Sequence, residues 1–416
     1  MHLSKKSVLI NSMSLLILGI IFSGNLFDDR LAILNSVITI PQIIFLFFTV
    51  TFIIYIKNYG FILNNSLSLK FYYIFILYLF INFFIVSIAN KLPINIYALD
   101  KNLHVILIYP LLFLFFYTCD YNLFIPKLIF TIKTICLIFL FAAILKIFLN
   151  NGIPEGESGK RLSVFSGGPI VFARMMLVGS FLFMYKNYKY LFFGKRLNFI
   201  ISSIFILMAI LSGSKFPILI FIIINFIYYI SSLKFNYNLF IFIIIFTIFI
   251  SFILFYINDI INLDISSLNR IFDLFLSNDI SNLSSVSARQ EFIYTCFQIF
   301  YDYPIFGCGV GNWGSLANYY YNFSEAAVLY LDYPHNILLE ILSETGILGF
   351  LFFLLIFYKM IFIKKDFNIF YLIFIFYFTN SLSSGDLMDF RFTFLWYFIS
   401  ILFNKNILIY ENNSYI

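Results

Sequence analysis

The chain of 416 residues is 62% apolar, 22% aromatic and only 11% charged, and its mean hydropathy is +0.97. Soluble globular domains carry about 25% charged residues, so this composition excludes a soluble enzyme. The net charge of +6 gives no indication of a nucleic-acid partner, and four scattered cysteines exclude a disulfide framework. Because no group of cysteines and histidines has the spacing of zinc ligands, we expect no metal.

Continuous apolar runs of roughly 17 to 25 residues, rich in Ile, Phe and Leu, predict helices that cross a membrane. We therefore expect an all-α, polytopic integral membrane protein of about twelve transmembrane helices with one large outer loop. The predicted spans are residues 7–24, 33–56, 71–89, 102–118, 127–149, 169–185, 197–212, 216–233, 238–258, 336–357, 367–384 and 391–405. This predicts nine helices in residues 1–258, a loop domain at 259–334, and three helices with a tail in residues 335–416.

The distribution of lysine and arginine predicts which side of the membrane each loop faces. With both termini in the cytoplasm, fourteen of the 26 basic residues fall inside and nine outside, as the positive-inside rule requires. Thirteen of the fourteen inner residues are lysine, whereas five of the nine outer residues are arginine. Since the planar guanidinium group binds phosphate and carboxylate at two points, the outer face is predicted to bind anions.

Two outer segments place cations near the membrane surface in the first half of the chain. The Gly/Ser/Asn-rich loop at 150–168 ends with Arg161 near the next span, which itself contains Arg174. Arg174 either reaches up to the interface or lines an anionic pocket. A very short hairpin, SGSKFP at 212–217, holds Lys215 at the outer rim, where it could equally be an ordinary interfacial lysine.

The long polar loop at 259–334 has two recognisable parts. Residues 288–302 are predicted to form a helix with Phe292, Cys296 and Ile299 on one side. The alternating glycines of GCGVG, residues 307–311, follow no strand and are predicted to make a tight turn rather than a dinucleotide site. Cys296 and Cys308 fall in the same loop and could pair, although no feature of the sequence requires it.

The loop ends at the sequence YPHNILLEILSETGILGF, residues 333–350, where His335 stands directly before an apolar helix. A histidine exchanges a proton near neutral pH, so this position could serve general acid–base chemistry at the membrane surface. The alternative is an ordinary helix start in which Asn336 caps the helix. Glu340 and Glu344, further along the helix, are expected to support the imidazole or, in the interpretation that we favour, to pair within the bundle.

The last outer turn, SLSSGDLMDFRF at 381–392, carries Asp386, Asp389 and Arg391, which are predicted to pair locally and to cap a helix. Together the outer face offers four permanent cations and one imidazole from distant segments: Arg161, Arg174, Lys215, Arg289 and His335. Such a set suits a phosphate-bearing substrate, and two cations could stabilise a departing diphosphate without a metal ion.

Three segments in this order carry a resemblance: SGSKFP (212–217), SARQEFIYTCFQIFYDYPIFGCGVGNW (287–313) and PHNILLEILSETGILG (334–349). They resemble the O-antigen ligase and polymerase superfamily of bacterial membrane glycosyltransferases, and RLSVFSGGPIVFA (161–173) is similar to the family's segment before its next span. The resemblance implies an inner-membrane enzyme of the GT-C fold, an undecaprenyl-diphosphate-linked saccharide donor, and inverting transfer without metal or cofactor.

The same resemblance implies roles for individual residues. Arg289 and the cation after SGS would contact the donor diphosphate, with Arg161 and Arg174 as further candidates, and His335 would activate or orient the acceptor hydroxyl. Family members commonly have arginine after SGS, whereas this chain has Lys215, which keeps the charge and loses the two-point contact.

Two activities within the superfamily fit the chain. A polymerase joins lipid-linked repeat units into O-antigen or capsule, whereas a ligase transfers the finished glycan to lipid A-core. We favour the polymerase, whose partners would be a lipid-linked donor, a lipid-linked acceptor, membrane lipids and a chain-length regulator protein. A flippase for lipid-linked oligosaccharide also has about twelve spans, but it should carry its charges along a central cavity rather than on one face.

Overall fold

The computed structural model describes residues 5–21, 32–33, 38–60, 67–89, 96–118, 121–150, 155–156, 159–165, 168–184, 194–232, 284–320, 333–358 and 368–401. Within these ranges the chain is helical apart from turns and two pairs of very short antiparallel strands. Strand β1 (Ala32–Ile33) pairs with β2 (Ile38–Thr39), and β3 (Glu155–Gly156) pairs with β4 (Gly159–Lys160).

The helices in chain order are α1 (Lys5–Ile21), α3 (Ile40–Tyr59), α4 (Leu67–Ala89), α5 (Ile96–Thr118), α6 (Tyr121–Leu149), α7 (Gly168–Met184), α8 (Lys195–Leu211), α9 (Lys215–Ser232), α13 (Ser284–Asp302), α14 (Trp313–Tyr320), α16 (Ile337–Ile356) and α17 (Ile369–Ser384). A further helical run covers residues 391–401. Long apolar runs form helices here because, away from water, every backbone N–H and C=O must find its partner within the segment.

Eleven of the twelve predicted spans contain one of these helices, and the ninth, 238–258, lies outside the described residues. The second span differs at its start, because residues 32–33 and 38–39 are strands and the helix begins at Ile40, with Pro41 in its first turn. Among the described residues, only Ile125–Leu149 and Ile337–Ile356 are by themselves long and apolar enough to cross a membrane. The count of twelve and the orientation therefore stay predictions.

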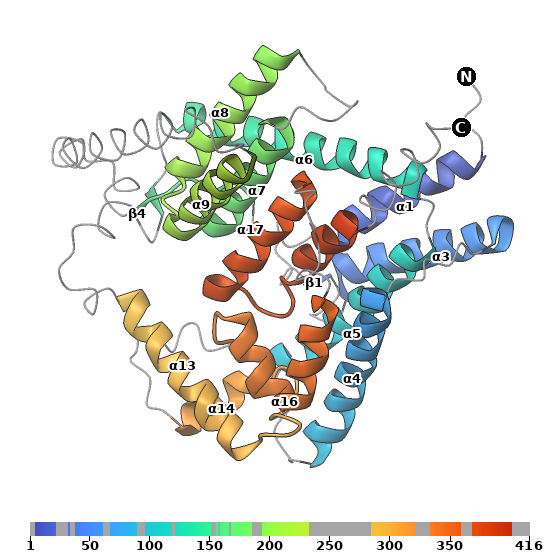
Figure 1. Cartoon of the computed structure of the whole chain (residues 1–416), viewed down its shortest axis with the longest axis vertical. Coiled ribbons are helices and arrows are strands. Elements are labelled where there is room, and N and C mark those ends of the chain that lie inside the picture. The colour runs from blue at the N-terminus through green and yellow to red at the C-terminus, as the bar shows by residue number, and fades with distance from the viewer. Residues whose placement is uncertain are drawn as a thin grey trace.

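Helix α7 lies at the centre of one half of the molecule. It packs against α6, α8, α9 and α17, and every residue from Phe172 to Phe183 is buried, including Arg174. Helix α16 organises the other half and packs against α4, α13 and α14. Figure 1 shows α7, α8 and α9 gathered at one end of the molecule and α13, α14 and α16 at the opposite end, with α17 between them.

The predicted helix of the long loop is present as α13, and its predicted apolar face is buried. Phe292, Cys296 and Ile299 are 2%, 1% and 0% exposed. They form a small core with Cys308 and Trp313, separate from the main core. This core fixes α13 on α16 and so determines where Arg289, one turn before Phe292, is held.

Candidate functional site

His335 lies at the start of α16, in the turn that precedes the helix. Asn336 caps the helix, as the simpler interpretation of the sequence predicted, and its side-chain oxygen accepts hydrogen bonds from the N–H groups of Leu338 and Leu339 at 3.0 and 3.2 Å. His335 itself has φ 55°, in the left-handed region that residues other than glycine rarely adopt. Such conformations persist only where the surrounding structure holds them in place, and they concentrate at functional positions.

The imidazole ring of His335 is held between two aromatic rings. It stacks on Phe292 of α13, with ring centroids 5.8 Å apart and planes inclined by 28°, and it meets the Tyr333 ring at 4.3 Å. Arg289 lies one helical turn before Phe292, on the same side of α13. The contact between the two segments therefore brings together the histidine and the arginine that the sequence predicted as catalytic partners.

Charge links the same groups. Burial, and then the positive charge of Arg289, lower the pKa of His335 to about 4, so the imidazole is neutral at pH 7. Burial also lowers the pKa of Arg289, while the nearby Tyr333 phenol opposes this shift. Burial raises the pKa of Tyr333 well above its usual value, as do the carboxylates of Asp386 and Asp389. Tyr333 thus interacts electrostatically with both Arg289 and the acidic turn at 386–389.

Arg174 also interacts electrostatically with Tyr333, and its positive charge opposes the rise in the Tyr333 pKa. Its guanidinium is 7% exposed and donates from Nη2 to the backbone oxygens of Ser384, at 2.6 Å, and Asn380, at 3.4 Å. In the described part of the chain, the Nε atom of Arg174 has no hydrogen-bond partner. Arg174 is therefore buried and lines a pocket, as one of the two alternatives from the sequence expected.

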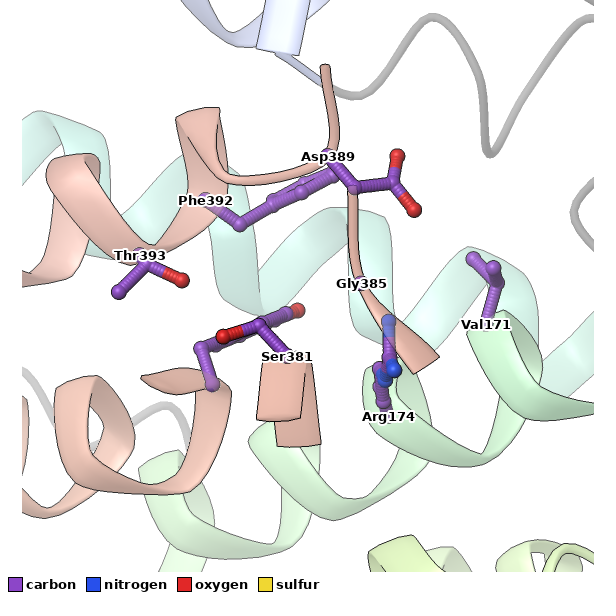
Figure 2. Close-up of a pocket in the computed structure, with 8 residues that line it drawn as sticks. Val171, Arg174, Ser381, Gly385, Asp389, Phe392 and Thr393 are labelled. Atoms are coloured by element: carbon purple, nitrogen blue, oxygen red, sulfur yellow. The ribbon is translucent and has the colours of Figure 1, made fainter. Parts of the chain in front are cut away.

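This pocket is formed by the start of α7, the end of α17 and the turn that follows it (Figure 2). Its lining includes Val171, Arg174, Ser381, Asp389, Phe392 and Thr393. The Asp389 backbone N–H donates to Asp386 Oδ1 at 2.7 Å, which confirms the predicted local capping. In the described residues, Arg174 and Asp389 line one pocket without forming an ion pair with each other.

Glu340 and Glu344 pair within the bundle, the interpretation that the sequence analysis favoured. Their partner is Lys101 of α5, whose Nζ donates to both carboxylate oxygens of Glu344, at 2.9 and 2.8 Å, and pairs with Glu340 Oε1. Glu340 Oε1 also accepts the N–H of Leu387 at 3.1 Å. Lys101 is one of the nine basic residues that the sequence analysis placed on the outer side. It is 0% exposed because it pairs with the two buried carboxylates.

The glycine turn at 307–311 packs against the backbone of α16 at Ser343 and Glu344. All three glycines have left-handed φ values of 73°, 98° and 83°, which confirms the predicted tight turn. The N–H groups of Cys308 and Gly309 donate to the backbone oxygens of Ser343 and Glu344, at 3.0 and 2.9 Å. A Cβ atom on Gly307 would lie 2.3 Å from the Glu344 backbone, so only glycine allows this approach.

Arg161 and Lys215 share a second location, at the hairpin between α8 and α9. Arg161 donates from Nε to the Ser212 backbone oxygen at 3.1 Å and from Nη2 to Ser214 Oγ at 3.3 Å. Lys215 begins α9 directly after this hairpin. These contacts hold Arg161 at the hairpin that Lys215 directly follows.

Cys296 and Cys308 are both buried and both free, so the pairing that the sequence left open is not present. Burial raises the pKa of both thiols, which keeps them protonated and unreactive. Sequence reasoning missed the parts played by Tyr333 and Lys101. Tyr333 could have been noticed as the aromatic residue two positions before His335, whereas no local signal marks Lys101 as buried.

Comparison with known proteins supports the resemblance. The family model described as O-antigen ligase matches residues 197–354, which include Lys215, Arg289, His335 and both glutamates of α16. No curated protein matches the chain. With the apolar helices described above, the family match supports a membrane protein. Residues 197–354 thus carry the O-antigen ligase family region, and the chain is recognised as consistent with the O-antigen ligase and polymerase superfamily.

Proposed function

We propose that the chain is a glycosyltransferase that joins undecaprenyl-diphosphate-linked repeat units into O-antigen or capsular polysaccharide at the outer face of the bacterial inner membrane. One observation carries the proposal. The His335 imidazole stacks on Phe292 of α13, one helical turn after Arg289, and the positive charge of Arg289 helps to lower the pKa of the imidazole. A fixed cation beside a neutral imidazole is the arrangement that metal-free displacement of a diphosphate requires.

In this reaction the acceptor hydroxyl oxygen attacks C1 of the donor sugar, and the bond from C1 to the diphosphate oxygen breaks on the opposite side. The leaving group carries the electron pair away as undecaprenyl diphosphate. Arg289 stabilises the negative charge that develops on it, a contribution worth about 10² to 10³ in rate for one such donor. The proton of the acceptor hydroxyl passes to the neutral imidazole of His335.

The electrostatics of the site favour this proton transfer only after the donor binds. Before the donor binds, burial and then the charge of Arg289 hold the pKa of His335 at about 4, so the imidazole is a weak base. A bound diphosphate offsets the charge of Arg289, and opposite charge near an imidazole raises its pKa. Donor binding therefore makes His335 a stronger base. In the absence of substrate, its low pKa keeps the imidazole from being protonated and inactivated.

Arg161 and Lys215 are the further cations that we propose for the diphosphate, on the basis of the family resemblance and their shared hairpin. Lysine lacks the two-point contact of arginine, so Lys215→Met should reduce activity less than Arg289→Gln. The buried network of Lys101, Glu340 and Glu344 would support the site indirectly. It fixes the first two turns of α16, the helix that His335 directly precedes.

The test is transfer by the purified full-length protein in detergent, supplied with lipid-linked repeat units from cells that lack the chain. The parent should lengthen the glycan, while His335→Ala and Arg289→Gln should each slow the reaction at least a hundredfold. Arg196→Gln, which alters an exposed arginine of α8, is the matched control and should retain full activity. Parent-like rates in both site variants would refute the proposed centre.

The family description favours a second candidate, the ligase, because the matching model is named for that activity. The two differ in the acceptor, so the same assay is repeated with lipid A-core added. In cells, loss of a polymerase leaves single repeat units on the surface glycan. Loss of a ligase instead leaves bare core while lipid-linked polymer accumulates.

A further inference from the structure

The pocket beside Arg174 differs from the Arg289 position in its charge. Arg289 and His335 form a site whose fixed charge is positive, whereas Arg174 lines a pocket together with Asp389, and Asp386 is buried close by. Figure 2 shows Arg174, from α7, and Asp389, from the turn after α17, near opposite ends of the Gly385 segment. A diphosphate placed here would be repelled by two carboxylates, and a cation would be repelled by Arg174.

The size of the pocket favours a small group. Its enclosed part has room for a group about the size of one water molecule. One hydroxyl group fits this space, whereas a phosphate group, with four oxygens around phosphorus, is larger. A hydroxyl group also suits the lining, because it can accept from the guanidinium of Arg174 and donate to a carboxylate oxygen of Asp389.

The position of the pocket relative to the proposed centre indicates which hydroxyl it would take. The turn that carries Asp389 contacts the first turns of α16, because the Leu387 N–H donates to Glu340 Oε1 at 3.1 Å. His335 directly precedes α16, and its ring meets the Tyr333 ring at 4.3 Å. The turn that lines the pocket therefore packs close to His335, the residue proposed to take the proton of the acceptor hydroxyl.

We propose that the pocket of Arg174 and Asp389 binds a hydroxyl group of the acceptor saccharide, and that the donor diphosphate binds at Arg289. This inference rests on the proposed glycosyl transfer and assigns a substrate to each part of it. It also revises the expectation that Arg174 holds diphosphate. The bound hydroxyl is a neighbour of the attacking one, and its contact with the pocket fixes the sugar ring so that the attacking hydroxyl meets His335.

The experiment separates the two substrates by steady-state kinetics of the purified full-length protein. The acceptor is free repeat-unit oligosaccharide, released from the lipid by mild acid, and the donor is the intact lipid-linked repeat unit. In Arg174→Gln and Asp389→Asn the KM for the free acceptor should rise about tenfold, the effect of one charge-assisted hydrogen bond, while the KM for the donor stays within about twofold. Arg289→Gln should show the reverse pattern.

Inorganic pyrophosphate provides a second readout that does not depend on turnover. Its binding, measured by calorimetry, should weaken in Arg289→Gln and stay unchanged in Arg174→Gln and in the control Arg196→Gln. If Arg174→Gln does not fold, Asp389→Asn alone decides, because that change keeps the side-chain shape. An unchanged acceptor KM in an active Asp389→Asn variant, or loss of pyrophosphate binding in Arg174→Gln, would overturn the assignment. A parent that transfers nothing would instead refute the proposed function, and this inference with it.

Discussion

Replacing Lys101 by methionine should destabilise the protein more than almost any other single change. Lys101 Nζ donates to both oxygens of Glu344, at 2.9 and 2.8 Å, and also pairs with Glu340, and all three side chains are buried. Lys101→Met leaves two carboxylates without a cation. Removing one partner of a buried ion pair costs about 3 to 5 kcal/mol, because the remaining charge loses its compensation.

Removing all three charges together should restore the stability. In the triple variant Lys101→Met, Glu340→Gln, Glu344→Leu no buried charge is left in this network. The amide oxygen of the glutamine introduced by Glu340→Gln would still accept the N–H of Leu387. Replacing a whole buried ion network by neutral groups is often neutral for stability, so this variant should recover to within about 1 kcal/mol of the parent.

The measurement is denaturant titration in detergent micelles, followed by the fluorescence of Trp313 and Trp396, both 0% exposed and therefore sensitive to unfolding. Lys101→Arg is the matched variant that keeps the charge in a larger group. A free energy of unfolding for Lys101→Met within about 1 kcal/mol of the parent would refute the reasoning, since loss of the cation should cost several times that. A triple variant less stable than the single one would do so as well.

Three further predictions concern the start and the middle of α16. Because the pKa of His335 lies near 4 in the folded protein, below its ordinary 6.5, its neutral form contributes stability that is complete above pH 6.5 and is lost as pH falls toward 4. Relative to His335→Gln, the parent should lose on the order of 3 kcal/mol across that window. Gly346→Ala should prevent folding, since φ is +65° and the new Cβ would lie 2.3 Å from a backbone oxygen. Asn336→Ala should cost about 1 kcal/mol through the lost cap and should also reduce transfer, because the cap adjoins His335.

The glycine and cap changes each have a matched control in the chain. Gly194→Ala adds a methyl group where nothing lies within 4 Å, and it should leave folding unchanged. Asn368→Ala removes the cap of α17, where the side chain accepts from the Tyr371 N–H at 2.8 Å. It should cost a similar free energy of unfolding without slowing transfer. Equal effects of the two cap variants on transfer would contradict a specific link between Asn336 and His335.

The helices were predictable because apolar runs of this length leave the backbone few alternatives, and the burial of Phe292, Cys296 and Ile299 on α13 followed from helical spacing alone. The pairing of Lys101 was not predictable. It lies in a polar stretch just before an apolar run, which is typical of a loop boundary, and its partners Glu340 and Glu344 stand more than 230 positions later in the sequence. Local pattern carries no information about a contact between such distant segments.

The site was predictable to the extent that its chemistry is visible in residue types. Arg289 and His335 were chosen because a guanidinium and an imidazole suit a diphosphate leaving group and a hydroxyl nucleophile. Their shared position depends on the packing of Phe292 against His335, which only the folded structure shows. For Asp389 the sequence predicts local pairing and helix capping alone. It gives no sign that Asp389 lines a pocket together with Arg174.

The boundaries of the family match suggest where polymerase and ligase activities diverge. Arg289 and His335 lie within the matched region, residues 197–354, whereas Arg174 and Asp389 lie outside it on either side. Both activities break the same bond to undecaprenyl diphosphate, so they can share the donor chemistry; they differ only in the hydroxyl group that attacks. If the Arg174 pocket selects that hydroxyl, the choice of acceptor depends on residues outside the matched region. Substitutions in the pocket should then change which acceptor is used while the rate of donor cleavage stays the same.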